Sequence, residues 1–276
     1  MKVKLADKHG FCFGVKRAIK LAESHQGGIT LGPLIHNKKE IERLKNDFGV
    51  TVEESVENLP QDSEVIIRTH GIPKDDLAKL TQSAKKIIDA TCPFVTKPQK
   101  ICEIMSQEGY QIIIFGDVNH PEVQGVMSYS SSEPIVVMNP KELFGAKLRE
   151  KVALVSQTTK KIEDFLGVAS FLVQRCAEVR IFNTICNATF DNQEAARRLS
   201  QEVDIMIIAG GKNSSNTKQL LSICLEHCQD SYLIEDESEL DPQWFENKKI
   251  CGVTAGASTP EWIIERVVRT IEGYGG

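Results

Sequence analysis

The sequence predicts an α/β protein whose mostly parallel sheets occur in three repeated parts that converge on a shared centre. First, short β-branched runs alternate with helical patterns along the chain. Second, runs such as 112–115 and 205–208 are apolar throughout, which is typical of parallel strands buried on both faces. Third, Cys12, Cys92 and Cys186 divide the 276 residues into three parts of similar length with one such thiol each. This spacing indicates a threefold internal repeat.

Strand and helix patterns follow one another along the whole chain. Runs rich in β-branched residues predict strands at 3–6, 29–32, 65–69, 86–91, 111–116, 134–138, 152–156, 179–185, 204–209, 231–235 and 249–254. Apolar residues at helical spacing predict helices at 14–25, 37–47, 74–83, 95–108, 161–175, 190–201, 215–228 and 260–272. A sheet that is parallel or mostly parallel follows from this alternation.

Three sets of loops correspond when the three parts are aligned. The first set follows a strand in each part and contains His36, the run His120-Pro121-Glu122, and the run Ser214-Ser215-Asn216. The second set contains His70, Thr158 and Ser258, and the third supplies Cys92, Cys186 and Cys12. No cysteine-bearing strand follows residue 258, so strand 3–6 must complete the last part. We therefore expect domains at 13–91 and 92–185, and a third, discontinuous domain formed by 1–12 and 186–276.

The loops of all three sets are expected to face one cavity. In open α/β sheets, ligands bind outside the carboxyl ends of the strands. Three sheets that face a common axis would bring together three thiols, three histidines, one carboxylate and several hydroxyl and amide groups. Arg68, the one arginine in these loops, is expected inside strand 65–69, which leaves its direction open.

Composition narrows the classes of protein and partner. The net charge of −5 and the isoelectric point near 5.8 argue against a nucleic-acid partner, since backbone phosphates attract basic surfaces. No apolar run approaches the ~20 residues that span a bilayer, so we expect no membrane association. Eight cysteines without an apolar targeting segment predict a cytoplasmic protein, because a reducing compartment favours thiols that bind metal or react.

The three repeated thiols leave two kinds of metal site open. Three cysteines and a histidine can ligate zinc, although structural zinc sites usually take ligands in closely spaced pairs. A cubane iron–sulfur cluster normally takes four thiolates, so three would leave one iron open for a substrate oxygen. Burial is the stronger interpretation for the other thiols. Cys102 and Cys176 are expected in helical patterns, and Cys224 and Cys228 in helix 215–228. Cys251 is expected in an apolar strand.

The remaining groups in the loops suit an anionic ligand such as a phosphate. Ser214, Ser215 and Asn216 open a helix, where free N–H groups attract anions, although such residues are also ordinary N-caps. A single histidine after a strand is usually a surface residue, but three at related positions favour ligand binding. Glu122 suits the first turn of a helix and also a proton-transfer role beside His120.

Eight motifs in order carry a resemblance to a known family. They are Gly10-Phe11-Cys12-Phe13-Gly14-Val15-Lys16-Arg17-Ala18-Ile19, Arg68-Thr69-His70-Gly71, Asp89-Ala90-Thr91-Cys92-Pro93, His120-Pro121-Glu122-Val123, Gln157-Thr158-Thr159, Asn183-Thr184-Ile185-Cys186, Lys212-Asn213-Ser214-Ser215-Asn216 and Thr254-Ala255-Gly256-Ala257-Ser258. Over residues 4–269 the chain resembles the 4-hydroxy-3-methylbut-2-enyl diphosphate reductases of the non-mevalonate isoprenoid route. Asn119 and Ser156 depart from the residues common in that family, which affects only local loop shape.

The resemblance implies an oxidoreductase whose fold is a trefoil of three pseudo-threefold-related α/β domains with mostly parallel sheets. It implies that these domains surround a central cavity with one 4Fe-4S cluster held by Cys12, Cys92 and Cys186. It implies that the allylic hydroxyl of the substrate binds the fourth iron. Two one-electron transfers would then yield isopentenyl or dimethylallyl diphosphate and water, with a donor such as ferredoxin or flavodoxin. It also implies that the diphosphate is bound by His36, His70, His120, Ser214, Ser215, Asn216 and Ser258. Glu122 would supply protons, and Thr158 would hold the substrate and relay them.

Two other classes of function compete with a reductase. An iron–sulfur hydro-lyase would use the open iron as a Lewis acid without net redox and would need no electron donor. A cluster-based sensor would bind without catalysis. Neither accounts as well for a carboxylate beside a phosphate pocket, and this acidic chain lacks the basic surface of a nucleic-acid sensor.

Overall fold

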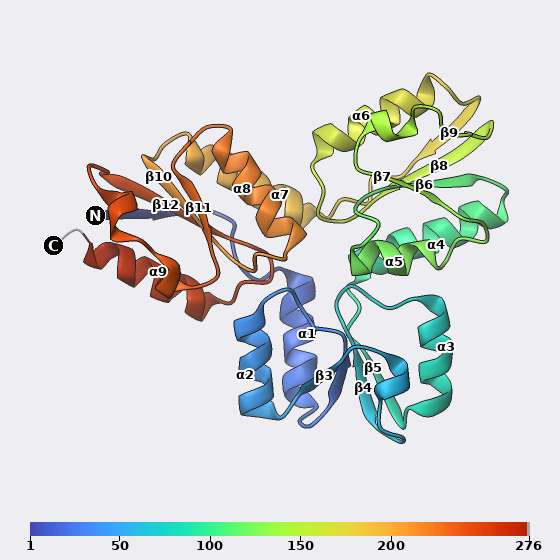
Figure 1. The fold of residues 1–276 in the computed structure, drawn as a ribbon, viewed down its shortest axis with the longest axis horizontal. Coiled ribbons are helices and arrows are strands. Elements are labelled where there is room, and N and C mark those ends of the chain that lie inside the picture. The colour runs from blue at the N-terminus through green and yellow to red at the C-terminus, as the bar shows by residue number, and fades with distance from the viewer. Residues whose placement is uncertain (275–276) are drawn as a thin grey trace. The chain divides into compact units, whose positions relative to one another are not determined.

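A computed structural model describes residues 1–274, which form three four-stranded parallel sheets with helices (Figure 1). The described chain divides into two compact units. The first unit holds residues 1–16 and 35–43 and the segment from Asn187 onward, and the second holds residues 17–34 and 44–186. The predicted fold class, α/β with parallel sheets, is confirmed.

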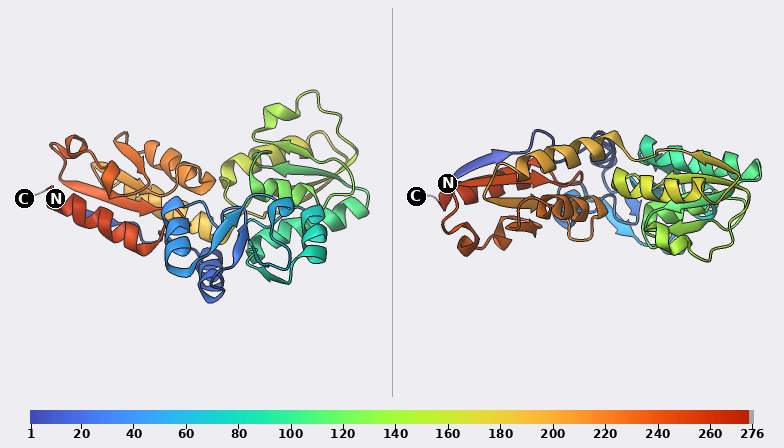
Figure 2. Two further views of the ribbon diagram at one scale, coloured as in Figure 1. Left: turned by 60° about the horizontal axis from the view of Figure 1, so that its bottom comes forward. Right: turned by 90° about the horizontal axis from the view of Figure 1, so that it is seen from above.

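The first unit contains a sheet built from both ends of the sequence. Its strand order is β1 (Lys2–Leu5), β12 (Ile250–Ala255), β10 (Ile205–Ala209) and β11 (Ser231–Ile234). β1 pairs in parallel with β12, with Val3 opposite Cys251, as predicted for strand 3–6. β1 and α9 (Glu261–Gly273) lie side by side in Figures 1 and 2.

Both faces of this sheet are covered by helices. Ile205 and Ile207 of β10 belong to the cluster that contains Ile263 of α9. Met206 and Ile208 point the other way and pack with residues of α7 (Asn187–Ser200) and α8 (Ser215–Leu225). Alternate side chains of β10 are therefore buried on opposite faces, which explains why the strand is apolar throughout.

The second unit contains the other two sheets. One has the order β3 (Thr51–Glu53), β2 (Ile29–Leu31), β4 (Glu64–Ile67) and β5 (Lys86–Asp89), with helix α3 (Lys74–Ser83). The other has the order β7 (Ile135–Val137), β6 (Gln111–Phe115), β8 (Lys151–Ser156) and β9 (Glu178–Ile181), with helices α4 (Pro93–Gln107), α5 (Pro121–Met127) and α6 (Ile162–Val173). Helices α1 (Phe13–Ser24) and α2 (Lys38–Phe48) pass from one unit to the other.

The same strand order occurs in all three sheets. The strand before Cys12, Cys92 or Cys186 is always at one edge, as β1, β5 or β9. Its neighbour is β12, β4 or β8, and the strand that leads into the first set of loops comes third. The predicted threefold repeat is therefore present in the topology of the sheets, each with the cysteine-bearing strand at its edge.

Several predicted boundaries were wrong. β9 ends at Ile181 instead of residue 185, because the side chains of Asn183 and Thr184 bond to the backbone. Arg68 lies outside the strand in which it was expected, since β4 ends at Ile67. Cys176 and Cys228 lie just beyond the helices α6 and α8. The short elements α5 and β3 were not predicted, and no helix among the described residues is both long and apolar enough to cross a membrane.

Candidate active site

Each of the three repeated cysteines directly precedes a helix. Cys12 comes before α1, Cys92 before α4 and Cys186 before α7. A helix N-terminus carries unpaired N–H groups and the positive end of the helix dipole, so this position stabilises a thiolate.

Each of the three cysteines also makes an equivalent backbone hydrogen bond. The N–H of Cys92 donates to Thr69 O at 3.0 Å, and the N–H of Cys186 donates to Thr158 O at 3.0 Å. In the first unit, the N–H of Cys12 donates to Ala257 O at 3.2 Å. Each acceptor lies two residues beyond the strand next to the cysteine-bearing strand, so the repeat extends to the loops that carry the thiols.

The other cysteines have a different environment. Cys102, Cys224 and Cys251 are fully buried, and burial raises the pKa of each thiol to about 12. Burial also raises the pKa of Cys176 and of Cys228. A thiol that keeps its proton is a poor metal ligand, because the thiolate is the ligating form.

Cys12, Cys92 and Cys186 are all half-buried, and no disulfide links any of the eight cysteines in the described part of the chain. Partial exposure together with a helix N-terminus suits a thiolate ligand. The donor set therefore fits a cofactor held by thiolates.

The second unit brings Glu122 and Thr158 together. Glu122, on the first turn of α5, is 1% exposed. Its Oε1 accepts from the backbone N–H of Thr158 at 2.6 Å, and its Oε2 accepts from the Thr158 hydroxyl at 2.7 Å. Burial raises the pKa of Glu122 above its ordinary value of 4.5, while the Thr158 hydrogen bonds and the charge of Lys160 lower it by less. A buried carboxyl with a raised pKa is suited to hold and deliver a proton.

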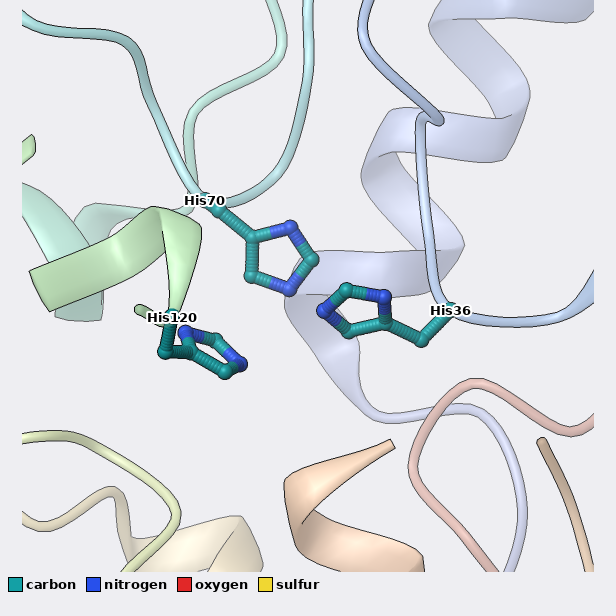
Figure 3. A group of neighbouring side chains, drawn as sticks. All are labelled: His36, His70 and His120. Carbon is teal, nitrogen blue, oxygen red and sulfur yellow. The ribbon is translucent and has the colours of Figure 1, made fainter. Parts of the chain in front are cut away.

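His120 and His70 lie beside this carboxyl group in the same unit. His120 caps α5, because its Nδ1 accepts from the N–H of Glu122 at 3.2 Å. A neutral His120 therefore carries its proton on Nε2, where it can serve as a donor. The rings of His70 and His120 make an edge-to-face contact with centroids 5.4 Å apart (Figure 3). Figure 3 also labels His36, which comes from the loop before α2 and belongs to the first unit.

In the first unit, the loop of His36 packs on the turn before α8. The Ser258 hydroxyl donates to His36 O at 3.3 Å. A Cβ atom on Gly211 would lie 2.3 Å from His36 O, so only glycine permits this close approach. These contacts place two predicted binding residues, His36 and Ser258, beside the β10–α8 turn.

The start of α8 presents polar groups with few protein partners. Ser214 is the N-cap, and its hydroxyl accepts from the N–H of Thr217 at 3.3 Å. Asn216 is 4% exposed, and neither its Oδ1 nor its Nδ2 has a hydrogen-bond partner among the described residues. The same holds for the hydroxyls of Thr217 and Thr254. Buried polar groups without partners are costly, so this cluster is suited to bind a polar ligand. Ser215 is half-buried at the first position of the same helix.

Sequence reasoning missed some polar residues of the second unit. Lys160 is 3% exposed, and its Nζ donates to the sulfur of Met138 at 3.2 Å. Burial lowers the pKa of Lys160, while nearby carboxylates, including that of Glu122, partly oppose the shift. Arg68, whose direction was left open, donates from Nε to Gly71 O at 3.2 Å. Lys160 directly follows the Gln-Thr-Thr motif, but a lysine in a sequence usually indicates an exposed surface.

The matches of this sequence among protein families and known proteins agree on one family. The family profile described as LytB protein matches residues 3–272. The chain is similar to the 4-hydroxy-3-methylbut-2-enyl diphosphate reductase of Wolinella succinogenes, with 96% identity over 276 residues and 100% of both chains covered. It is also similar to the enzyme of that name from Nitratiruptor, with 60% identity over 272 residues, 99% of this chain and 98% of the relative.

Solved structures agree with the sequence relatives. A structure of (E)-4-hydroxy-3-methyl-but-2-enyl diphosphate reductase, described as the terminal enzyme of the non-mevalonate pathway, matches with a TM-score of 0.71 and 42% identity, covering 99% of this chain and 100% of that chain. A Plasmodium falciparum structure, described as E-1-hydroxy-2-methyl-but-2-enyl-4-diphosphate reductase, matches with a TM-score of 0.90 and 27% identity, covering 97% and 87%.

Proposed function

We propose, because this chain belongs to the LytB protein family, that it is an oxidoreductase that converts (E)-4-hydroxy-3-methylbut-2-enyl diphosphate to isopentenyl diphosphate and dimethylallyl diphosphate. The overall reaction takes up two electrons and two protons, breaks the allylic C–O bond and releases one water. The observation in the structure that best supports it is the buried carboxyl of Glu122, bonded through both oxygens to Thr158. Such a group suits the proton delivery that this reaction requires.

Cys12, Cys92 and Cys186 are the residues that would hold a 4Fe-4S cluster. Their half-buried positions before three helices, each with the same backbone hydrogen bond, support this assignment. Such a cluster would transfer electrons one at a time. The electrons would come from a one-electron carrier such as ferredoxin or flavodoxin. We place the reaction in the cytoplasm, where reducing conditions keep thiols out of disulfides.

The diphosphate would be bound by polar side chains and backbone N–H groups. Ser214, Ser215 and Asn216 offer side chains and backbone N–H groups at the start of α8, and Ser258 adds a hydroxyl. His36, His70 and His120 would contribute imidazole donors. The unpaired amide of Asn216 supports this assignment, since a phosphate oxygen would accept from its Nδ2.

Glu122 would deliver protons, and Thr158 would position it. Because Thr158 donates to both carboxyl oxygens, it fixes the plane of the carboxyl group. The Thr158 hydroxyl can turn toward a substrate hydroxyl and pass a proton between the two groups. The raised pKa of Glu122 keeps a proton available closer to neutral pH.

We also assign three domains, at 13–91, at 92–185, and at 1–12 with 186–276. The common strand order of the three sheets supports this division, since each domain then holds one sheet. Each cysteine would lie at a boundary between domains.

An anaerobic assay tests the proposed function. Protein reconstituted with iron and sulfide is mixed with the hydroxylated diphosphate and a strong one-electron reductant, and the products are measured by chromatography. Formation of both isoprenoid diphosphates only with reductant supports the reductase. Conversion without any reductant would favour a hydro-lyase, and binding without conversion would favour a sensor.

A further inference from the structure

We propose that Arg17 is a positioning residue for the loop that carries Cys92. The proposal rests on the proposed function in one respect, that Cys92 is a cluster ligand. Arg17 lies on the second turn of α1, and its guanidinium contacts the residues directly before Cys92.

Arg17 binds this loop through two hydrogen bonds. Its Nη1 donates to Thr91 O at 3.2 Å, and its Nη2 donates to Asp89 O at 3.0 Å. A guanidinium holds two acceptors in a fixed fork, whereas a lysine ammonium acts as a single point charge. The fork therefore fixes the direction of two carbonyl groups in the three residues before Cys92.

The N–H groups of the same loop are held from other sides. Ala90 N donates to Ile67 O at 3.1 Å, and Cys92 N donates to Thr69 O at 3.0 Å. Thr91 N donates to Asp89 Oδ1 at 2.8 Å, which closes a local turn. The last residue of β4, the loop after β4 and the local turn thus hold the N–H groups, and Arg17 holds two of the carbonyls.

The equivalent loop before Cys186 has a different support. Asn183 closes the same local turn, because its Oδ1 accepts from Ile185 N at 3.1 Å. Thr184, two residues before Cys186, then ties the loop to β8. Its hydroxyl donates to Ser156 O at 2.6 Å and accepts from Ser156 N at 2.8 Å.

Ala90 occupies the place of Thr184 in the Cys92 loop, two residues before the cysteine. A methyl group forms no hydrogen bond, so the Cys92 loop has no side chain equivalent to the Thr184 hydroxyl. In the Cys92 loop the tie to the neighbouring strand is made by the backbone N–H of Ala90, which donates to Ile67 O. The hydrogen bonds of Arg17 add a side-chain support from outside the loop. This comparison separates Arg17 from an ordinary surface arginine and makes its effect specific to Cys92.

The position of Arg17 also connects two predicted ligands. α1 begins directly after Cys12, so the helix that follows one ligand donates to the loop before another. A cluster can be retained only if its thiolates stay in place, and supporting hydrogen bonds around metal ligands tune affinity.

The test compares Arg17→Met and Arg17→Lys with Lys20→Met, which removes one charge from an exposed position on the same helix. Hydrogen exchange measured by mass spectrometry on cluster-free protein reports on residues 86–95. We expect Arg17→Met to increase exchange in this segment by about tenfold or more, and the segment around Cys186 to be unchanged. Arg17→Lys should give an intermediate increase, and Lys20→Met none.

A second measurement follows iron after reconstitution. Release of iron to a chelator should be several-fold faster from Arg17→Met than from Lys20→Met. Circular dichroism checks the fold, and Arg17→Lys carries the test if Arg17→Met does not fold. Equal exchange and equal iron release in Arg17→Met and Lys20→Met would overturn the proposal, and so would wild-type behaviour of Arg17→Lys. If wild-type protein bound no iron, the proposed cofactor would fail, while exchange in the cluster-free protein would still decide whether Arg17 supports the loop.

Discussion

Thr158 holds both oxygens of the Glu122 carboxyl group, one through its backbone N–H and one through its hydroxyl. The carbonyl of the same threonine accepts from the N–H of Cys186 at 3.0 Å. One residue thus contacts both the buried carboxyl and a proposed cluster ligand, which links the proposed proton donor to the cysteine loop.

Glu122→Gln should lower turnover but leave substrate binding unchanged. Glutamine preserves the shape of the side chain but has no proton to deliver, so we expect turnover to fall by about 10²-fold or more. Steady-state turnover and substrate-induced changes in the visible spectrum are compared under anaerobic conditions. Near-normal turnover of the glutamine variant would mean that Glu122 only shapes the loop.

The same substitution should have a pH-dependent effect on stability. Because the pKa of Glu122 is raised in the folded chain, its proton favours folding. That contribution is fully present below the ordinary value of 4.5 and is lost as pH rises through the raised pKa. The Tm of Glu122→Gln relative to wild type should therefore increase with pH across this window. Glu150→Gln, at an exposed position, is the control and should show no such trend. A constant Tm difference for Glu122→Gln would contradict the raised pKa.

Lys160→Met should shift the pH profile of turnover. The charge of Lys160 lowers the pKa of Glu122, so its removal should raise that pKa further. If protonated Glu122 is the proton donor, the alkaline limb of the turnover profile should move to higher pH. The exposed Lys147→Met is the matched control. An alkaline limb at the same pH in Lys160→Met and wild type would contradict the role of this charge.

Serine substitutions should separate ligating from structural cysteines. Cys12→Ser, Cys92→Ser or Cys186→Ser should each remove or severely destabilise the cluster. Cys102→Ser and Cys176→Ser should retain it, since burial raises the pKa of both thiols and makes them poor ligands. Iron and sulfide content with the visible absorption band measures the result. Full iron content in any of the first three variants would exclude that residue as a ligand.

Two substitutions at the start of α8 should separate anion binding from stability. Asn216→Ala removes an amide that has no protein partner among the described residues, so binding of inorganic diphosphate should weaken without loss of thermal stability. Ser214→Ala removes the N-cap and should weaken binding and also cost about 1 kcal/mol of stability. The expected loss of binding is about 1–3 kcal/mol in each variant, measured by titration calorimetry. Unchanged affinity in both would place the anion elsewhere.

The sequence predicted the class of the fold and its repeat, because β10 and the part of β6 after Gln111 are apolar and the cysteines recur at similar intervals. It missed β3 and α5, since elements of three and seven residues carry little periodic pattern. The sequence singled out Glu122 and Thr158 separately, but their bidentate pairing depends on contacts between distant segments. The burial of Lys160 and the hydrogen bonds of Arg17 could not be predicted, since both residue types are usually exposed.

The pairing of β1 with β12 affects when the proposed cluster ligands can come together during synthesis of the chain. Lys2 pairs with Ile250, and the N–H of Cys12 donates to Ala257 O. Lys2 and Cys12 are therefore synthesised long before the residues with which they pair. Contacts between residues so distant in sequence form late and slow the folding of a chain. The segments around Cys92 and Cys186 can fold during translation, whereas Cys12 reaches its final place only after residue 257 has emerged. The proposed cluster, which would need all three thiols, could therefore be held by all of its ligands only after residue 257 has emerged.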